Sequence, residues 1–341
     1  MVTGHTGFKG SWMSKILMDL GSNVVGYSLN PPTDPNLYSI LNLGSKTDSV
    51  IADVRDYDTL LNTLEQYKPE IVIHMAAQPL VGESYRSPRE TYEVNVQGTV
   101  NILEAIRKTD CVKSFLNVTT DKVYLNREWC WGYREDEELN GYDPYSNSKS
   151  CSDLVTQCYS RCFFDKKIPI STARAGNVIG GGDFTNPRII PDCMRAALSK
   201  GTVVLRNPGS TRPYQHVLEP VFAYLMIAAK QYEDYAYAGN YNVGPNEESC
   251  VDNETLVKIF CEKWGPEVKY RIDSDPNAPH EANFLKLDIS KIKQTFGWTP
   301  IWDIDMAVEK TVDWIKAYSE GRDIDAIMSE QISEYMQRIS W

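Results

Sequence analysis

Apolar and polar positions along the first half of the chain form two alternating patterns. Short apolar runs bounded by turn residues indicate strands at 22–29, 50–53, 70–74 and 112–119. Stretches with helical spacing lie before and between them, at 11–20, 55–67 and 89–108. Strands that alternate with helices pair in parallel through right-handed crossovers. The pattern therefore predicts an α/β fold built on a Rossmann-type doubly wound parallel sheet, which binds its ligands at the carboxyl ends of the strands.

The second half of the chain predicts a smaller unit that is interleaved with the first. A chain of 341 residues exceeds what one hydrophobic core usually organises. We expect a Rossmann domain from 1–178 and about 214–240, and a smaller α/β domain from about 179–213 and 241–341. Helical spacing recurs at about 303–320 and from 324 onward. We expect the last stretch to cover the smaller domain or to join an interface.

Composition narrows the class of protein. Hydrophobic residues make up 42% and charged residues 24%, which is typical of a soluble globular protein. A formal net charge of -11 argues against general nucleic-acid binding, because a phosphate backbone requires a basic surface. We see neither a secretory leader nor an apolar stretch that could span a bilayer, so we expect a cytoplasmic protein without a membrane partner. Eight cysteines without metal-ligand spacing indicate reduced thiols and no metal site.

Glycines with a three-residue spacing open the chain. The loop Gly4-His5-Thr6-Gly7-Phe8-Lys9-Gly10 is followed at once by a predicted helix. Such a loop lets the backbone approach a pyrophosphate and directs free N–H groups of the helix N-terminus at it, although a tight turn without a ligand would look similar. Only Met1 and Val2 precede the loop, so the first strand is very short or the native N-terminus is longer. We expect a dinucleotide to contact Gly4, His5, Gly7, Phe8, Lys9 and Gly10; His5 is equally well explained as a turn residue.

The residues leave the choice between NAD and NADP open. An acidic residue at the end of the second strand would favour NAD, but the chain has Ser28-Leu29-Asn30-Pro31-Pro32 there and no arginine for a 2′-phosphate. Asp53, with Val54, is a candidate for the adenine end, and Asp53 also fits a helix cap. Small residues just after the fourth strand would let the nicotinamide half approach. Further cofactor candidates are Ala76, Ala77, Gln78, Thr119 and Ala175.

Two motifs carry the candidate chemistry. Thr119-Thr120-Asp121-Lys122 places hydroxyl, carboxylate and amine groups at the end of a predicted strand, and Tyr145 and Lys149 lie one turn apart on a helix that begins near Pro144. A free tyrosine ionises near pH ~10, and a neighbouring ammonium group favours the phenolate. We therefore expect Lys149 to lower the pKa of Tyr145 so that the phenolate can take a proton from a hydroxyl group.

With these motifs in order, the chain resembles the extended short-chain dehydrogenase/reductase family, and within it the nucleotide-sugar 4,6-dehydratases. The resemblance spans nearly the whole chain and includes the glycine loop, residues 119–124, Tyr145 with Lys149, and the downstream stretches 174–180, 188–191 and 212–217. It implies NAD as the cofactor of the Rossmann domain and a nucleotide sugar in the smaller domain. It also implies that Thr120 orients the sugar 4-hydroxyl, that Asp121 protonates the departing 6-hydroxyl, and that Lys149 binds the nicotinamide ribose.

Lys122 departs from the pattern of the dTDP-glucose enzymes, which usually have Glu after the acid. Asp121-Lys122 together with the loop sequence GHTGFKGSW resembles the members that act on CDP-glucose, in a route to dideoxy sugars of bacterial surface polysaccharide (O-antigen). A lysine kept neutral could remove the proton from C5 once C4 is a ketone. Alternatively, Lys122 stays charged and stabilises the enolate or the cofactor phosphates.

The diphosphate of such a substrate requires fixed cations and hydrogen-bond donors, and arginine suits phosphate because its fork binds two oxygens. The resemblance suggests a homodimer, or a higher homo-oligomer, built on the helices at 89–108 and 145–164. The candidates for the diphosphate and nucleotide are Asn177, Arg188, Arg206, Arg212 and His280.

Two other functions compete with a dehydratase. A nucleotide-sugar 4-epimerase or reductase shares the glycine loop and the Tyr-Lys pair, but usually lacks the acid and lysine after the threonine. A nicotinamide-sensing regulator keeps the fold without catalysis and has no need of Thr120, Tyr145 and Lys149 together. The Asp121-Lys122 pair therefore favours dehydration.

Overall fold

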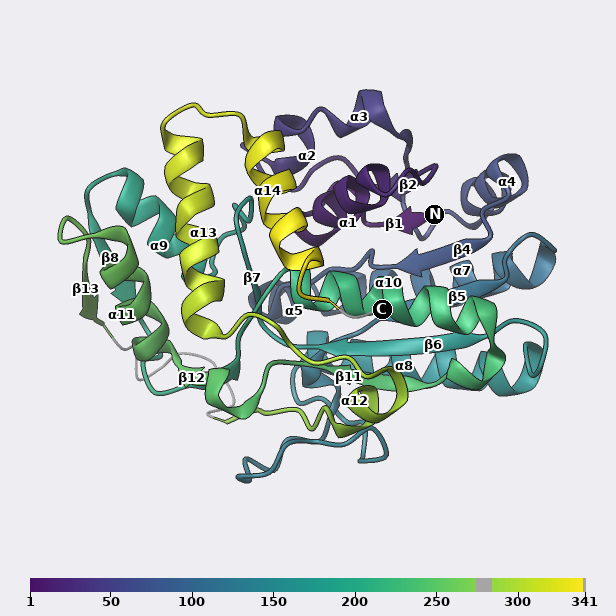
Figure 1. Ribbon diagram of the computed structural model, residues 1–341. Coiled ribbons are helices and arrows are strands. Elements are labelled where there is room, and N and C mark those ends of the chain that lie inside the picture. Colours follow the sequence, from purple (N-terminus) through teal and green to yellow (C-terminus); the bar gives the residue numbers. More distant parts are fainter. Residues whose placement is uncertain (274–283, 340–341) are drawn as a thin grey trace.

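A parallel sheet forms the centre of the molecule (Figure 1). The computed structural model describes residues 1–273 and 284–339. Within them, seven parallel strands lie in the order β11-β6-β5-β4-β1-β2-β3. This order reverses direction between β1 and β4, as in a doubly wound sheet, and confirms the predicted fold class. The strands are β1 (Val2–Thr3), β2 (Val25–Ser28), β3 (Asp48–Ile51), β4 (Ile71–His74), β5 (Ser114–Val118), β6 (Ile170–Ala175) and β11 (Asn240–Val243).

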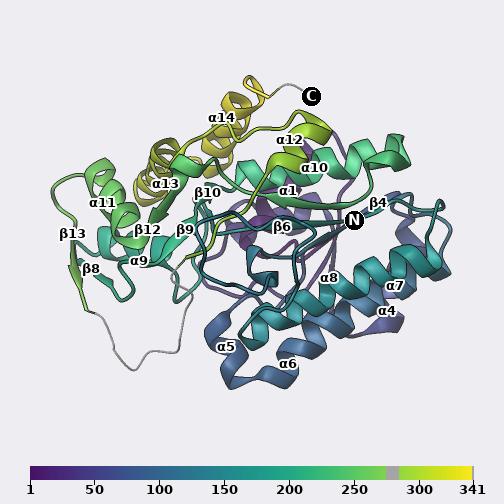
Figure 2. The same ribbon diagram turned by 90° about the horizontal axis from the view of Figure 1, so that it is seen from below.

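Helices cover both faces of the sheet. On one face lie α4 (Tyr57–Tyr67), α7 (Gly98–Lys108) and α8 (Pro144–Phe163), which form a layer in Figure 2. On the other face lie α1 (Phe8–Asp19) and α10 (Leu218–Glu233). Successive strand residues point to opposite faces, so Phe115 of β5 packs into the core beneath α7, and Leu116 packs into the larger core beneath α1 and α10. Both cores are buried, as expected for a parallel sheet.

The predicted helix over 89–108 is present, but it contains a π turn that the sequence did not predict. The segment consists of α6 (Pro88–Tyr92), a wide π turn (Glu93–Gln97) and α7. The buried Asn95 lies in the π turn, where its Oδ1 accepts from the Gln78 N–H at 2.8 Å and its Nδ2 donates to the Ser148 hydroxyl at 2.9 Å. A π turn inserts a residue and so redirects a side chain. These bonds tie the loop after β4 to the start of α8.

Short strands and helices after β6 form a second unit at the carboxyl end of the sheet. β8 (Thr202–Leu205) pairs with β13 (Lys269–Ile272), β9 (Thr211–Pro213) with β12 (Cys250–Asp252), and β7 (Val178–Ile179) with β10 (Gln215–His216). α9 (Ile189–Leu198) and α11 (Asn253–Trp264) pack beside them. β11 belongs to the large sheet, so sheet-forming residues extend past the predicted boundary near 240. The division into two domains otherwise stays a prediction.

The C-terminal helices are α12 (Ser290–Phe296), α13 (Ile304–Ser319) and α14 (Ile324–Met336). α13 packs on α11 of the second unit, and α14 lies against α13. The Tyr335 hydroxyl of α14 donates to Glu219 of α10 at 2.6 Å, and Asp325 pairs with Lys15 of α1 at 3.0 Å. The final helix therefore packs on α13, as predicted for the smaller unit, and also reaches α1 and α10. In the described part of the chain, no helix has the length and apolarity needed to cross a membrane.

Candidate functional site

The glycine loop lies at the point where the strand order reverses, between β1 and the start of α1. Gly4 has a φ of 77°, and a Cβ on it would lie 2.9 Å from the Ala76 backbone nitrogen. A Cβ on Gly10 would lie 2.0 Å from the Gly4 carbonyl oxygen. The first helical turn is packed directly on the loop, which only glycine permits. Gly7 caps α1 without a side-chain hydrogen bond, so the N–H groups of the first turn are available to an anion.

His5 points away from this cradle. Its ring is fully buried, its Nε2 hydrogen-bonds the Ser49 hydroxyl at 2.7 Å, and Tyr38 packs edge-on against it. Burial lowers the pKa of His5 to about 4, so the ring is neutral. The structure thus places His5 as a packing residue between the loop and β3, and leaves only its backbone facing the loop. By contrast, Phe8 and Lys9 line a cavity next to the loop.

The loop after β4 is held by the protein itself. The Thr3 hydroxyl accepts from the Ala76 N–H at 3.1 Å. The Gln78 side chain is hydrogen-bonded within the protein, since its Nε2 donates to the Leu80 carbonyl at 3.1 Å and to the Thr91 hydroxyl at 2.9 Å. Gln78 therefore shapes the loop that follows Ala77, which is the segment we predicted beneath the nicotinamide half.

Asp53 and Val54 lie after β3, at the predicted adenine end. Asp53 forms an ion pair with Arg55, with an Nη2–Oδ2 distance of 2.6 Å, and the pair lowers the pKa of Asp53. The cap of α4 is Asp56, three residues after the predicted Asp53, because Asp56 accepts from the Thr59 N–H at 3.1 Å. Val54 is buried and packs on Gly98, where a Cβ would lie 2.8 Å from the valine methyl group.

The ends of β5 and β6 carry the catalytic candidates. Thr119 is buried and its hydroxyl donates to Asp153 at 3.1 Å, beside the buried Arg174–Asp153 ion pair. Its side chain is therefore engaged in the protein core. Thr120 is buried at the cavity wall and donates to Asp121 Oδ1 at 2.9 Å. Ala175, at the end of β6, also lines the cavity.

Asp121 and Lys122 form an ion pair beside Asn177. Lys122 Nζ donates to Asp121 Oδ1 at 3.3 Å and to Asn177 Oδ1 at 3.1 Å. The Asp121 side chain is 1% exposed and that of Lys122 is 22% exposed. Gly176 makes room for the carboxylate, because a Cβ there would lie 2.7 Å from Asp121 Oδ2. The structure thus brings Asp121 and Lys122, the predicted acid and the predicted base, into contact. Asn177, which was predicted for the diphosphate, accepts a hydrogen bond from Lys122.

Tyr145 and Lys149 occupy the first turns of α8, which Asp143 caps through the Ser146 N–H at 3.0 Å. Tyr145 lines the same cavity as Thr120. Burial raises the pKa of Tyr145 to about 12, and the positive charge that opposes this rise comes from Arg188. The prediction that Lys149 lowers the pKa of Tyr145 is therefore not met, because desolvation of the phenolate outweighs the nearby charge.

Lys149 is directed at the sheet. Its Nζ donates to the Val118 carbonyl at 3.0 Å, and burial together with the charge of Lys9 lowers its pKa to about 7. Burial and then Arg188 lower the pKa of Lys9 to about 8. Three cations therefore converge on the site, which makes it suited to an anionic ligand.

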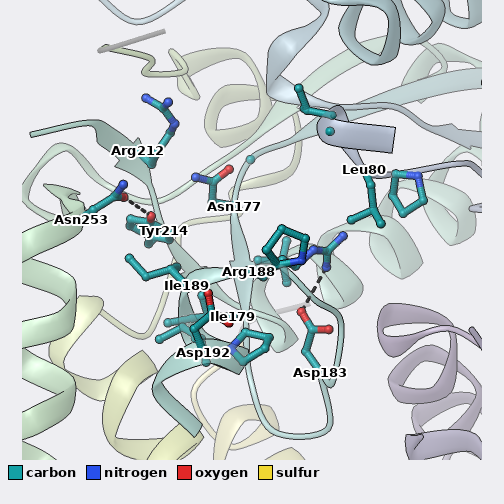
Figure 3. A pocket seen from close by; sticks show the side chains of 18 of the residues that line it. Leu80, Asn177, Ile179, Asp183, Arg188, Ile189, Asp192, Arg212, Tyr214 and Asn253 are labelled. Carbon is teal, nitrogen blue, oxygen red and sulfur yellow. Dashed lines mark hydrogen bonds and ion pairs between the residues drawn. The ribbon is translucent and has the colours of Figure 1, made fainter. Parts of the chain in front are cut away.

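The cavity has a volume of about 630 Å³ and joins the catalytic candidates Thr120, Asp121, Lys122 and Tyr145 to the second unit. Arg188 lies near its middle and pairs with Asp183 at 3.1 Å, as Figure 3 shows. Arg212, on β9, lines the same cavity near Tyr214 and Asn253. The exposed Arg206, after β8, also lines it. His280 lies outside the described residues.

Several cavity residues escaped the sequence analysis. Tyr214 donates to Asn253, which itself donates to the Asn207 carbonyl at 2.7 Å, and so connects β8, β9 and α11. Asp183 is buried and orients Arg188. The helix α5 (Val81–Arg86) forms the facing wall. Tyr214 lies in the stretch 212–217 that the resemblance includes, whereas no local motif marks Asp183, Asn253 or α5, which come from segments far apart in sequence. In the described parts of the chain, no cluster of residues could hold a metal ion.

The amino-acid sequence matches a known protein family over most of its length. The sequence pattern of GDP-mannose 4,6 dehydratase extends over residues 1–311. The chain belongs to the GDP-mannose 4,6-dehydratase family. This family member is 45% identical to CDP-glucose 4,6-dehydratase of Salmonella typhimurium, over 98% of the chain and 95% of that protein. It is 25% identical to dTDP-glucose 4,6-dehydratase of Xanthomonas campestris pv. campestris, over 92% of each.

Solved structures agree with the fold of this dehydratase-family protein. UDP-glucose 4-epimerase of Thermotoga maritima, crystallised with UDP-glucose, superposes with a TM-score of 0.80 at 21% identity, covering 93% of this chain and 98% of the epimerase. dTDP-glucose 4,6-dehydratase of Bacillus anthracis, crystallised with NAD, gives 0.77 at 20% identity, covering 95% and 98%. These structures confirm the fold, and the family match with the 45% identity to the Salmonella enzyme confirms the predicted resemblance to the nucleotide-sugar dehydratases.

Proposed function

We propose that the protein catalyses the NAD-dependent dehydration of CDP-D-glucose to CDP-4-keto-6-deoxy-D-glucose. The observation that carries the proposal is the contact between Asp121 and Lys122 at the same cavity wall as Tyr145. An epimerase needs only the redox base, whereas loss of water from C5 and C6 also needs an acid for the hydroxyl and a base for the proton. The 45% identity to the Salmonella CDP-glucose enzyme supports the substrate.

The glycine cradle fits the pyrophosphate of NAD. The absence of side chains at Gly4 and Gly10, the uncapped N–H groups of α1 and the nearby Lys9 suit a dianionic group. We expect Lys149 to bind the nicotinamide ribose, and Asp53 to serve the adenine end. When bound, NAD accepts a hydride from C4 of the sugar and returns it to C6.

Tyr145 takes the proton from the 4-hydroxyl, and Thr120 orients that hydroxyl. A phenol with a pKa of about 12 is protonated at neutral pH, so the reactive phenolate requires positive charge nearby. Arg188 supplies part of this charge. Its ion pair with Asp183 at 3.1 Å keeps the guanidinium in the cavity.

Asp121 and Lys122 carry out the elimination. Once C4 is a ketone, the C5 proton is acidic, and Lys122 in its neutral form removes it while Asp121 protonates the departing 6-hydroxyl. The contact at 3.3 Å lets one proton pass from the ammonium to the carboxylate, which creates the amine base and the carboxylic acid together. The competing role, a permanently charged Lys122 that stabilises the enolate, needs a different base.

The diphosphate and nucleotide extend from this cluster toward the second unit. Arg188, Arg206 and Arg212 all line the cavity, and Figure 3 shows Arg188 and Arg212 on either side of Asn177. Guanidinium groups bind phosphate oxygens in pairs. We expect these arginines, with Asn177 and His280, to fix the substrate by its nucleotide part.

Asp121→Asn tests the proposal. This variant retains Tyr145 and Lys149, so we expect it to oxidise C4 of CDP-glucose and accumulate the absorbance of reduced nicotinamide without releasing water. Matched Thr119→Ser, which keeps a hydroxyl for Asp153, should retain full turnover. An Asp121→Asn enzyme that forms the 4-keto-6-deoxy product at the wild-type rate would rule out Asp121 as the acid.

We further propose a homodimer through α7 and α8. Leu154 of α8 is 48% exposed and Phe163 is 44% exposed, which leaves apolar surface on this helix. We expect Leu154→Arg to convert the dimer to a monomer in light scattering. Leu20→Arg, at a position that is also 48% exposed but lies at the end of α1, is the matched control and should stay dimeric. A monomeric wild-type protein contradicts this proposal.

The cellular setting is also a proposal. All eight cysteines are free thiols, which supports a reducing compartment such as the cytoplasm. The product would enter a route to dideoxy sugars of bacterial surface polysaccharide (O-antigen).

A further inference from the structure

Among the described residues, four carboxylates line the cavity, and three of them are paired with a cation that lines it too. These three pairs are Asp121–Lys122, Asp183–Arg188 and Glu83–Arg86. The fourth carboxylate is Asp192 of α9, whose partner Arg195 is not one of the residues that line the cavity. Asp192 therefore presents its negative charge to the cavity, with its cation outside.

Arg195 fixes the carboxylate of Asp192 from outside the cavity. Its Nη2 donates to Asp192 Oδ1, one turn earlier on α9. The same guanidinium is held by the loop before α9, through the Phe184 carbonyl at 3.5 Å and Asn186 Oδ1 at 3.3 Å. The contact with Arg195 uses Oδ1 of Asp192, so Oδ2 keeps its capacity to accept a hydrogen bond from a ligand.

The position of Asp192 corresponds to the nucleoside part of a nucleotide sugar. Asp192 lies one helical turn after Arg188, whose carbonyl accepts the Asp192 N–H at 2.8 Å. α9 packs on β8 and α11 of the second unit. In Figure 3, Asp192 and Leu80 lie on opposite sides of Arg188. A substrate with its sugar beside Tyr145 and its diphosphate at Arg188 therefore extends its nucleoside toward Asp192.

We propose that Asp192 selects cytosine by accepting a hydrogen bond from the 4-amino group of the base. The proposal rests on the dehydratase function given above and names the residue that reads the nucleotide. An ionised carboxylate only accepts hydrogen bonds, and cytosine presents a donor at position 4. Uracil and thymine present a carbonyl oxygen there, so two acceptors would face each other. Asp192 thus attracts one base and disfavours the other two.

A carboxylate at this position needs a donor on the ligand. Arg206 and Arg212 line the same cavity and suit the diphosphate, whereas the charge of Asp192 repels phosphate. The nucleoside offers two kinds of donor, the 4-amino group of cytosine and the hydroxyl groups of ribose. CDP-glucose and UDP-glucose carry the same ribose, so a contact to ribose would not distinguish them. The two roles of Asp192 therefore predict different results with this pair of substrates.

Asp192→Asn tests the selection of the base. The amide has nearly the shape of the carboxylate, and it can turn its oxygen to cytosine or its NH₂ group to uracil. kcat/KM is measured for CDP-glucose and for UDP-glucose. We expect the ratio of the two values to fall about tenfold or more, because the repulsion of uracil is removed. Glu83→Gln is the matched control: Glu83 also lines the cavity and pairs with an arginine three residues later, and its variant should keep the wild-type ratio.

Binding of CDP and UDP provides a readout that does not depend on turnover. Calorimetry with NAD-loaded protein should show tighter binding of CDP in wild type and similar affinities for both nucleotides in Asp192→Asn, with thermal melting to confirm that the variant is folded. Equal wild-type affinities, or an unchanged CDP-to-UDP ratio in Asp192→Asn, overturn the proposal. Equal losses for both nucleotides assign Asp192 to the ribose and overturn it too. A wild-type protein that prefers CDP but does not dehydrate CDP-glucose contradicts the proposed function alone, so the two failures are distinct.

Discussion

Replacement of Glu219 by Gln is expected to remove a pH-dependent loss of stability. Glu219 is fully buried at the start of α10, where it accepts the Ile301 N–H at 2.9 Å, the Trp302 N–H at 2.7 Å and the Tyr335 hydroxyl at 2.6 Å. Burial raises its pKa to about 7 from the ordinary 4.5. The side chain joins α10 to the segment before α13 and to α14, so its ionisation acts on the packing of the C-terminal helices.

The sign and size of the change in stability follow from the pKa of Glu219 in the folded protein and its ordinary value in the unfolded chain. The folded protein binds the Glu219 proton more tightly than the unfolded chain does, so the stability from this group is complete below pH 4.5 and is lost as the pH rises through about 7. Each pH unit in this window costs about 1.4 kcal/mol, which gives a loss of about 3 kcal/mol in the free energy of unfolding.

Urea unfolding followed by tryptophan fluorescence measures the effect. Free energies of unfolding of wild type and Glu219→Gln are compared at about pH 5 and about pH 8. We expect wild type to lose about 3 kcal/mol more than the variant across this window, because other titrating groups cancel in the difference. Tyr335→Phe removes a hydrogen bond that favours the carboxylate, so its loss should extend to higher pH. If the free energies of unfolding of wild type and Glu219→Gln change with pH in parallel, the ionisation of Glu219 does not destabilise the folded protein.

Three further changes test the site. In Lys122→Gln we expect C4 oxidation to continue and exchange of the C5 proton with deuterated solvent to stop, as followed by mass spectrometry; exchange at the wild-type rate contradicts the base role. Asn177→Ala removes an acceptor of Lys122 at 3.1 Å and should slow C5 exchange about tenfold with little change in C4 oxidation, whereas a rise in KM alone would assign Asn177 to the diphosphate. Gly10→Ala places a Cβ 2.0 Å from the Gly4 carbonyl oxygen and should destabilise the loop by at least about 1–3 kcal/mol and weaken NAD binding in calorimetry, while Gly209→Ala, with open space around it, should do neither. Equal NAD affinities for the two glycine variants would contradict the cradle.

The sequence predicts the sheet and the meeting of the two motifs because both depend on local pattern and on one general rule. Strand and helix periods alternate clearly, and the carboxyl ends of parallel strands converge on one edge. Thr120 and Asp121 follow β5, and Tyr145 begins the helix after it, so their proximity follows from topology. The spacing of Gly4 and Gly10 is equally local, since a Cβ on Gly10 would clash with the Gly4 carbonyl oxygen and Gly4 itself has a positive φ.

The direction in which an individual side chain points is harder to predict from sequence than the fold. His5 lies in the glycine loop, yet its ring turns to Ser49 on β3, a contact that the spacing of the motif does not encode. The balance of forces on Tyr145 also depends on burial, which raises its pKa although Lys149 is one turn away. The π turn at Asn95 depends on partners on distant segments, so helical periodicity predicts the helix but not the π turn within it.

Cavity residues supplied by remote segments have no sequence signal of their own. Asp183 and Asn253 reach the cavity only because β6, β8 and α11 assemble around it. The final helix shows the same limit: its spacing predicts a buried face, but the partner of that face, through Glu219 and Lys15, is set by the tertiary fold.

Mass spectrometry of parallel reactions with CDP-, dTDP-, GDP- and UDP-glucose tests the substrate and the reaction together. The enzyme is incubated with NAD and each sugar, and the masses of the nucleotide-sugar products are measured. We expect the loss of one water from CDP-glucose alone. Unchanged CDP-glucose together with dehydration or epimerisation of a sugar on another nucleotide would contradict it.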